Sequence, residues 1–432
     1  MDTAITTLHA RQILDSRGRP TVEVDAWLDC GAFGRASVPS GASTGSAEAH
    51  ELRDGDASRY DGLGVLKAVA NVNGELAAAL RGADALEQRG LDERLAAIDG
   101  TPQLARLGAN AVLAVSLAVC RAAAAARGQQ LYQRVAQLCG ATPVLPLPMT
   151  NILSGGLHAG RGMDVQDFLA MPLRAATFGE ALHLLSRVRN AASQVAQQRG
   201  LTTLLADEGG LSPGLESGAA ALAMMTEAIE RAGLRPGEDI GIAIDVAAST
   251  LCETTGGYRF AREGVHRSSE QVTNLLASWV RDFPVVSIED GLDEEDWSGW
   301  SVLTQALGGK VQLVGDDLFA TNPQRLARGV GAGAANGVLV KANQNGTVSG
   351  TLHVIAQARA AGYATIVSAR SGETEDAFMS DLAVGSAAGQ IKIGSLRTSS
   401  TVAKYNQLLR IEEHSGAAYA GTAALRGWRG HA

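Results

Sequence analysis

The sequence predicts an α/β fold in which a β/α barrel follows a smaller α+β domain. Between residues 241 and 392, a short apolar run that ends in a polar or charged residue occurs six times, and successive ends lie 24 to 44 residues apart. That spacing suits one strand, one helix and their loops, the repeating unit of such a barrel. Because the carboxyl ends of barrel strands meet at one mouth, we expect the six end residues to lie together in the active site of an enzyme. They are Asp245, Glu289, Asp316, Lys341, Ser368 and Lys392.

The amino-terminal part has a different pattern. The first 60 residues alternate apolar and polar side chains in the manner of strands, as in TVEVDAWLD and FGRASV, around turn signals at Asp15–Gly18 and Gly31. From Val65 to Leu138 the chain is rich in Ala, Leu and Arg at helical spacing. We therefore expect an α+β domain over residues 1–138 and the barrel domain over residues 139–432, joined by the proline-containing stretch at 140–148.

The barrel region offers more candidate strands than an eight-stranded barrel needs. PLPMTNIL, DVQDFLAMP and TTLLAD precede the six runs and bring the number of candidates to nine. One of them must lie outside the barrel wall, and periodicity does not choose which.

The composition points to a small-molecule substrate. A net charge of −8 and a pI near 5.6, without basic runs, argue against nucleic acid or a membrane surface as the partner. The four cysteines show no CxxC spacing, which fits a reducing compartment, and the amino terminus lacks a signal-peptide pattern. The most apolar stretch, Ala109–Ala126, is interrupted by polar residues, so we expect a buried helix rather than a membrane span, and a cytoplasmic protein.

Three of the strand ends are carboxylates, and carboxylates that share one mouth repel each other unless a cation lies between them. Asp245, Glu289 and Asp316 form an all-oxygen set without Cys or paired His, which favours Mg²⁺ first and Mn²⁺ second. A single acid would more often cap a helix or pair with an arginine at the surface. Three acids in register favour the metal site.

Two further strand ends are lysines. Lys341 and Lys392 end the runs GVLVK and QIK. A lysine near a divalent cation and a second lysine has its neutral form favoured, which suits a general base that removes a proton beside a carboxylate. The alternative is an ammonium group that only neutralises the acids, and the residues alone leave both interpretations open.

Glycine-containing segments add anion-binding and acid functions. The loop Ser40–Gly45 has the composition of a loop that wraps a phosphate with backbone N–H groups, and Glu208 lies on the turn DEGG. Arg370 and Ser371 offer a second phosphate contact. The sequence GASTG also matches the GxSxG nucleophile elbow and raises a hydrolase as a competing class. Pro39 in the preceding strand and the lack of a clear apolar-faced helix afterwards weaken that match.

Several long segments, in order along the chain, resemble the enolase family. They are ARQILDSRGRPTVEV, VPSGASTG, ELRDGD, LGANAVLAVSLAV, DEGG, SIEDGLDEEDW, LVGDDLF, RSGETEDA and AKYNQLLRIEE. Enolases are Mg²⁺-dependent lyases that interconvert 2-phosphoglycerate and phosphoenolpyruvate. The resemblance implies an eight-stranded barrel of the ββαα(βα)₆ kind after a small α+β domain, and it assigns the DEGG segment to a connection outside the barrel wall.

The resemblance also implies roles at individual positions. The implied metal ligands are Asp245, Glu289 and Asp316 for a first Mg²⁺ and Ser43 for a second, which is expected with the substrate. Lys341 would remove the C2 proton, and Glu208 would help the C3 hydroxyl to leave. The implied substrate contacts are His158, Gln166, Asp167, Arg370, Ser371 and Lys392, of which Lys392 faces the carboxylate and Arg370 and Ser371 the phosphate. Two cations on the carboxylate would stabilise the enolate that forms when the proton leaves.

Four positions or runs depart from the family pattern. Ala369 stands where enolases ordinarily have a His before Arg370, and Asp167 stands where they have a Glu that is one methylene longer. Ser154 replaces the Asn of an NGG triplet, and RTSST follows Lys392 in place of a Ser-Arg-x-x-Arg run. The first two changes fall on the side of the site that handles the C3 hydroxyl. Proton abstraction is therefore better supported than the identity of the substrate.

These observations leave three interpretations. The first is a working enolase of glycolysis. The second is a relative that dehydrates a phosphonate or phosphinate analogue of 2-phosphoglycerate, such as a step that forms carboxyphosphonoenolpyruvate in a specialised pathway. The third is a pseudoenzyme kept for protein binding, and the retained lysines and acids argue against it.

Either enzyme would act on a small phosphorylated or phosphonylated carboxylic acid. Enolases are commonly dimers or octamers, and Arg17 and Glu412 or Glu413 lie in segments that resemble the family's dimer interface. We therefore expect a homodimer or an octamer.

Overall fold

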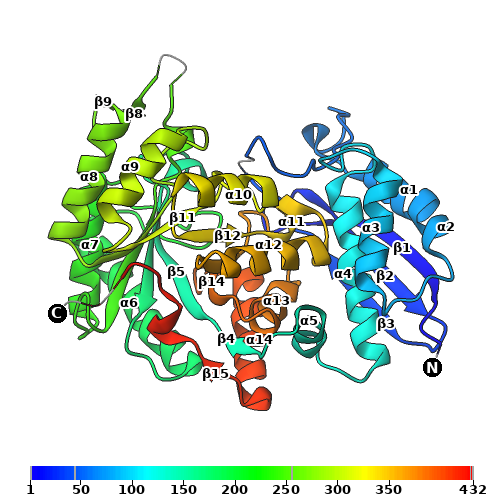
Figure 1. The fold of residues 1–432 in the computed structure, drawn as a ribbon. Coiled ribbons are helices and arrows are strands. Elements are labelled where there is room, and N and C mark those ends of the chain that lie inside the picture. The colour runs from blue at the N-terminus through cyan, green and yellow to red at the C-terminus, as the bar shows by residue number, and fades with distance from the viewer. Residues whose placement is uncertain (1, 43–44, 254–255, 429, 431–432) are drawn as a thin grey trace.

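The computed structural model, which describes residues 2–42, 45–253, 256–428 and 430, has a three-stranded sheet covered by helices at the amino terminus and a closed barrel after it. Figure 1 shows the two parts side by side, with the amino-terminal domain in blue and cyan. The predicted fold class is confirmed.

The amino-terminal sheet is antiparallel, in the order β1–β2–β3. Its strands are β1 (Ile5–Leu14), β2 (Pro20–Leu28) and β3 (Phe33–Ser37). They are joined at the two predicted turns, where Gly18 and Gly31 adopt φ values of 73° and 82° that other residues rarely reach. TVEVDAWLD and FGRASV are therefore strands, as their alternation predicts.

The longest helix of this domain, α4 (Ala109–Ala126), lies against β2 and β3. Gly34 permits the close approach, because a Cβ atom there would lie 2.2 Å from the carbonyl oxygen of Ala118. Within the described part of the chain, α4 alone has the length and mean hydropathy (1.7) of a membrane span, and 83% of it is buried inside the protein. The prediction of a buried alanine-rich helix is confirmed. The other helices are α1 (Leu66–Asn71), the π turn η2 (Val72–Leu76), α2 (Ala77–Leu80), α3 (Gln88–Asp99) and α5 (Leu131–Cys139).

Eight strands close the barrel in the order β5–β6–β7–β10–β11–β12–β13–β14. The strand β6 is antiparallel to both neighbours, and the other neighbouring pairs are parallel. This is the ββαα(βα)₆ arrangement that the resemblance implies. The ninth candidate, TTLLAD, lies outside the wall and makes one isolated bridge, between Leu205 and Leu211. The strands are β5 (Leu147–Ser154), β6 (Asp167–Pro172), β7 (Ile240–Asp245), β10 (Val285–Glu289), β11 (Gln312–Gly315), β12 (Gly337–Val340), β13 (Ala364–Ser368) and β14 (Gly389–Gly394).

Most helices around the barrel begin at a polar residue whose side chain accepts a backbone N–H of the first turn, a contact that stabilises a helix by about 1 kcal/mol. These caps are Thr177, Ser217, Ser268, Asp296, Asn322, Thr347 and Thr398. The helices are α6 (Phe178–Gln198), α7 (Gly218–Arg231), α8 (Ser269–Asp282), α9 (Trp297–Leu307), α10 (Pro323–Ala332), α11 (Ala342–Asn345), α12 (Val348–Ala360), α13 (Phe378–Gly385) and α14 (Ser399–Ser415). A hairpin of β8 (Tyr258–Phe260) and β9 (Val265–Arg267) projects from this layer (Figure 1).

We expected the stretch at 140–148 to be a linker between the domains. In the structure it is not free along its whole length. Its centre forms β4 (Val144–Leu145), which pairs with β15 (Ala418–Tyr419), and β5 begins at Leu147. The preceding helix α5 is ended by Gly140, which adopts a left-handed conformation (φ 64°), and the proline-containing stretch after it runs into the barrel strand β5.

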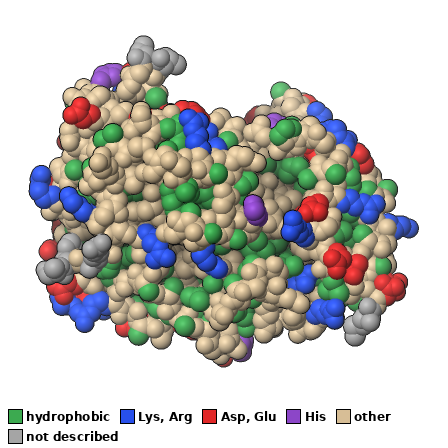
Figure 2. All heavy atoms as spheres, viewed as in Figure 1, with side chains coloured by type: hydrophobic (Ala, Val, Ile, Leu, Met, Phe, Trp, Pro, Cys, Tyr) green, Lys and Arg blue, Asp and Glu red, His purple; other side chains and the backbone are tan. Residues whose placement is uncertain are grey.

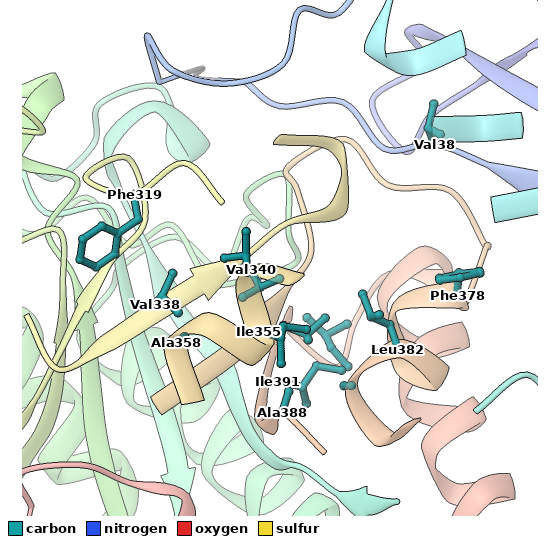
Figure 3. Packing of buried hydrophobic residues seen from close by; sticks show 14 of the residues in the cluster. Val38, Phe319, Val338, Val340, Ile355, Ala358, Phe378, Leu382, Ala388 and Ile391 are labelled. Atoms are coloured by element: carbon teal, nitrogen blue, oxygen red, sulfur yellow. The ribbon is translucent and has the colours of Figure 1, made fainter. Parts of the chain in front are cut away.

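Apolar side chains fill both the barrel interior and the layer between strands and helices. In Figure 3, Val338 and Val340 of β12 lie near Ile355 and Ala358 of α12, and all four are buried in the main core. A second buried cluster packs inside the barrel and includes Met149, Met171, Val286, Leu339 and Ile366. The barrel interior is therefore filled. Ser287, Gln312 and Gln390 form a buried polar group inside it, and the charged groups of the site gather where the strands end.

Polar contacts join the two domains. Arg121 of α4 forms a bidentate pair with Asp376, both distances being 2.6 Å, and Asp92 of α3 accepts hydrogen bonds from the backbone and hydroxyl of Ser349. A groove of about 610 Å³ remains between α3 and α12, and Figure 2 shows hydrophobic side chains gathered in this region of the surface.

Candidate active site

A cavity of about 30 Å³ lies at the carboxyl ends of the barrel strands. Most of the residues predicted for the site line it, although they come from segments that are far apart in the sequence. They are His158, Gln166, Glu208, Asp245, Asp316, Lys341, Arg370, Ser371 and Lys392. Ser43, the predicted ligand of a second metal ion, lies outside the described residues.

The three predicted metal ligands end or directly follow adjacent strands. Asp245 ends β7, Glu289 ends β10 and Asp316 follows β11, and their side chains lie next to the two lysines. The Nζ atom of Lys392 donates to Asp245 and to both oxygens of Glu289 at 2.8 Å. Lys341 donates to Asp316 at 2.5 Å. Two ammonium groups thus face three carboxylates.

This donor set fits a hard divalent cation. The three acids are between 1% and 8% exposed and offer only oxygen ligands, which Mg²⁺ prefers. Mg²⁺ held by Asp245, Glu289 and Asp316 would supply the positive charge that the two lysines supply to these carboxylates in the structure.

Two further acids, missed by the sequence analysis, stand beside this set. Asp290 and Asp317, together with Asp316, have carboxylate oxygens within 4.8 Å of one another. Asp290 accepts the backbone N–H groups of Asp316 and Asp317, each at 2.9 Å, and so fixes the start of that loop. Burial and neighbouring carboxylates raise the pKa of Asp290 well above its usual range and that of Asp317 to about 7. In the sequence, the acidic doublets Glu289–Asp290 and Asp316–Asp317 at these strand ends could have indicated the two additional acids.

The surroundings hold both lysines in the charged form. Burial acts to lower the pKa of Lys341, but the carboxylate of Asp316 outweighs it and the pKa is raised. Lys392 behaves in the same way beside Asp245 and Glu289. In this arrangement Lys392 neutralises the acids. A cation bound to Asp316 would compete with Lys341 for this carboxylate, which is the main group that keeps Lys341 protonated.

A second group of titratable side chains surrounds Glu208. Its carboxylate accepts from the amide of Asn151 at 3.1 Å and lies 3.9 Å from Nε2 of His158. Nδ1 of His158 is 3.0 Å from Asp167. Burial raises the pKa of Glu208. Burial alone would lower the pKa of His158, but Asp167 and Glu208 outweigh it and raise that pKa to about 9.

These two groups face each other across the mouth. Lys341 follows β12, whereas the group of Glu208 lies beside β5 and β6. In the closed ring, three strands separate β12 from β6 in either direction. Lys341 and Glu208 therefore lie on opposite sides of one small cavity.

The amino-terminal domain completes a third side of the site. Glu48 pairs with the Arg370 guanidinium, the shorter distance being 2.9 Å, and also accepts from the amide of Gln344, which donates to Asp316 as well. Arg17 donates to the hydroxyl of Ser371 at 3.2 Å. The sequence analysis missed Glu48 and Gln344, because their contacts depend on how the two domains are placed.

Comparison with known families matches both domains. Residues 5–135 match the family model described as "Enolase, N-terminal domain", and residues 142–427 match "Enolase, C-terminal TIM barrel domain". The chain belongs to the enolase family. Membership supports lyase chemistry, and the typical use of Mg²⁺ in this family agrees with the acidic groups at the mouth.

The enolase site is altered on the side of Glu208. Asp167 is fully buried, its two oxygens are taken by Ser154 (2.6 Å) and His158 (3.0 Å), and it is not part of the cavity lining. Ala369, in place of the usual His, does line the cavity. Asp167 is thus turned away from the cavity, and Ala369 presents only a methyl group to it.

Two further points concern the competing hydrolase class and the predicted dimer interface. The GASTG segment lacks the strand–turn–helix context of a nucleophile elbow, since β3 ends at Ser37 and the next α-helix of the described chain begins at Leu66. Arg17 and Glu412, expected near a dimer interface, are engaged within the chain: Arg17 with Asp15 and Ser371, and Glu412 with the backbone at the start of α6. The homodimer or octamer stays a prediction.

Proposed function

We propose that this protein is a Mg²⁺-dependent hydro-lyase that removes water from a small acid of the 2-phosphoglycerate type. The observation that carries the proposal is the position of Lys341 and Glu208 on opposite sides of one cavity. Removal of a proton from one face of a substrate and loss of a hydroxyl from the other require an acceptor and a donor in that relation.

In the proposed reaction Lys341 takes the proton from C2, and the electron pair of the broken C–H bond moves into the adjacent carboxylate to give an enolate. The enolate electron pair then forms the C2=C3 double bond as the C3–O bond breaks, and Glu208 gives its proton to the departing hydroxyl, which leaves as water. The raised pKa of the Glu208 carboxyl supports this role, because it favours the protonated form that a general acid needs. The reverse steps hydrate the product.

The remaining groups bind the substrate. Lys392 would face its carboxylate, and Arg370 and Ser371 would contact its phosphoryl or phosphonyl group, so Arg370 must exchange or share its contact with Glu48. Bound Mg²⁺, held by Asp245, Glu289 and Asp316, would supply positive charge that stabilises the enolate. A pseudoenzyme has no evident need for this concentration of buried, mutually paired charges.

The altered side of the cavity bears on the substrate. The primary candidate is 2-phosphoglycerate, with phosphoenolpyruvate as the product. A second candidate is a phosphonate or phosphinate analogue, such as the precursor of carboxyphosphonoenolpyruvate, and the specific observation in its favour is the small Ala369 beside the withdrawn Asp167. Loss of a preorganised donor at a leaving hydroxyl costs about 3–4 kcal/mol in the transition state.

Steady-state turnover of 2-phosphoglycerate, measured with Mg²⁺ on the parent and on the double variant A369H/D167E, tests the assignment. We expect weak turnover by the parent and a gain of up to about 10²–10³-fold in the double variant, the rate equivalent of that cost. A parental kcat/KM already within about 10⁴–10⁸ M⁻¹s⁻¹, without gain in the double variant, would identify an ordinary enolase. Absence of C2 proton exchange with any of these substrates would contradict the proposed lyase.

A further inference from the structure

Two of the departures from the enolase pattern touch each other in the fold. Ser154 ends β5 and Asp167 begins β6, and the two residues are partners in the antiparallel ladder. The Ser154 hydroxyl donates to Oδ1 of Asp167 at 2.6 Å, and both residues are fully buried. The two departures from the family pattern therefore form a single side-chain contact.

The packing around Ser154 fixes the direction of its hydroxyl. Its backbone N–H donates to the carbonyl of Leu211 at 2.7 Å, and Gly210 lies so close that a Cβ atom there would be 2.3 Å from Ser154 Oγ. A longer side chain at position 154 would meet the same backbone. The Ser154 side chain thus occupies a narrow space, and its hydroxyl donates there to Asp167.

This contact decides where Asp167 and His158 point. With Oδ1 taken by Ser154, Oδ2 receives Nδ1–H of His158, so the acid is held away from the cavity. His158 itself lies on the short 3₁₀ turn η3 (Gly156–Ala159), and its side chain is 9% exposed. Asp167 therefore orients the ring and leaves Nε2 directed at Glu208 and the cavity.

We propose that Ser154 is a positioning residue that, through Asp167, orients His158 toward Glu208 and the leaving group. The inference deepens the proposed function and rests on it for its kinetic consequence. Its structural part, the orientation and charge of His158, can be measured without substrate. The charged groups that face His158 are Asp167, Glu208 and, farther away, Asp245.

The test uses three variants of the full chain. Ser154→Ala removes the hydroxyl, and Ser154→Cys keeps nearly the same volume but offers only a weak donor. Ser380→Ala is the matched control, since Ser380 is also fully buried and its hydroxyl donates to the backbone of Lys404, away from His158. NMR of labelled histidine, with the His158 signal assigned by its loss in His158→Gln, gives the titration midpoint. Exchange of the C2 proton and dehydration are measured with 2-phosphoglycerate.

We expect both Ser154 variants to shift the His158 midpoint by about half a pH unit or more, because the Asp167 carboxylate that pairs with Nδ1 loses a donor and changes its position. Dehydration should slow by about tenfold, as for loss of one charge-assisted hydrogen bond. Exchange at C2 should be retained, because Lys341 lies on the opposite side. Ser380→Ala should change neither quantity.

Parental midpoints and rates in both Ser154 variants would overturn the proposal. So would full function in Ser154→Cys together with impairment in Ser154→Ala, because side-chain volume rather than the hydrogen bond would then matter. A shifted midpoint with unchanged dehydration would overturn the positioning role in catalysis. If the parent does not act on 2-phosphoglycerate, the proposed substrate fails, whereas the NMR measurement still decides whether Ser154 orients His158.

Discussion

Replacement of Lys392 by methionine tests whether the lysines and a divalent cation share the same carboxylates. The ammonium group lies 2.8 Å from oxygens of both Asp245 and Glu289, which are 3% and 1% exposed. Lys392→Met keeps a chain of similar length in the core and removes only the charge. Two buried carboxylates then lose their shared partner.

The expected loss follows from this burial. Removal of one partner from a buried ion pair costs about 3–5 kcal/mol. Burial and Asp245 raise the pKa of Glu289 well above its usual range, so Glu289 can take up a proton, and we expect the lower end of that range. For a chain of 432 residues, an unfolding entropy of about 2.1 cal/mol/K per residue gives about 0.9 kcal/mol/K, so a loss of about 3 kcal/mol corresponds to a fall in Tm of roughly 3 °C.

Magnesium should reverse this loss. Thermal unfolding is measured in EDTA and in MgCl₂, and calorimetric titration gives the Mg²⁺ affinity. The competing ammonium group repels the cation, and at about 4 Å near a protein surface the repulsion is about 4 kcal/mol for each pair of unit charges. Without that group the variant should bind Mg²⁺ at least about tenfold more tightly than the parent. Saturation at about 100 times Kd should then restore about 2.7 kcal/mol.

The matched control is Lys404→Met. Lys404 is fully buried and pairs with Glu373 at 3.0 Å, outside the predicted metal ligands, so its loss should lower Tm without a larger response to Mg²⁺. Equal Mg²⁺ affinity in the parent and in Lys392→Met, or an equal Mg²⁺ response in both lysine variants, would refute the shared-carboxylate reasoning.

The remaining predictions concern the metal, the two catalytic steps and one titrating acid. Asp316→Asn should remain folded and lose tight Mg²⁺ binding by calorimetry, so an unchanged affinity would exclude it as a ligand. Lys341→Ala should abolish exchange of the C2 proton with deuterium, whereas Glu208→Gln should keep exchange but block dehydration; parental exchange in Lys341→Ala would mean another base. Burial raises the pKa of Asp381 to about 6. The folded state therefore loses stability relative to the unfolded state as pH rises from about 4 to 6, and the loss of about 3 kcal/mol persists at higher pH. Asp381→Asn should therefore gain stability relative to the parent at pH 8 but not at pH 4, and a difference independent of pH between the two unfolding curves would contradict this.

Much of the fold could be read from local pattern. The six apolar runs with polar ends predicted strands that end at the barrel mouth, because a buried strand tolerates a charged residue only where it leaves the core. The alternation in TVEVDAWLD, the turn glycines and the alanine-rich segment of α4 were predicted for similar reasons. Family resemblance was needed to remove TTLLAD from the wall, since a short apolar run has the same composition inside and outside a barrel.

The sequence by itself determined which chemical groups stand at the ends of the barrel strands: three acids, two lysines, and the arginine and serine that follow the fifth run. Only the tertiary structure decided their partners. Glu48 and Arg370 are 322 residues apart in the chain, and their contact exists because the amino-terminal domain closes over the barrel. Lys392 meets Asp245 and Glu289, and Ser154 meets Asp167, because strand order and register bring them within hydrogen-bond distance. Local periodicity fixes which face of a strand a side chain occupies, but the charge state and direction of that side chain depend on neighbours that the closed barrel supplies.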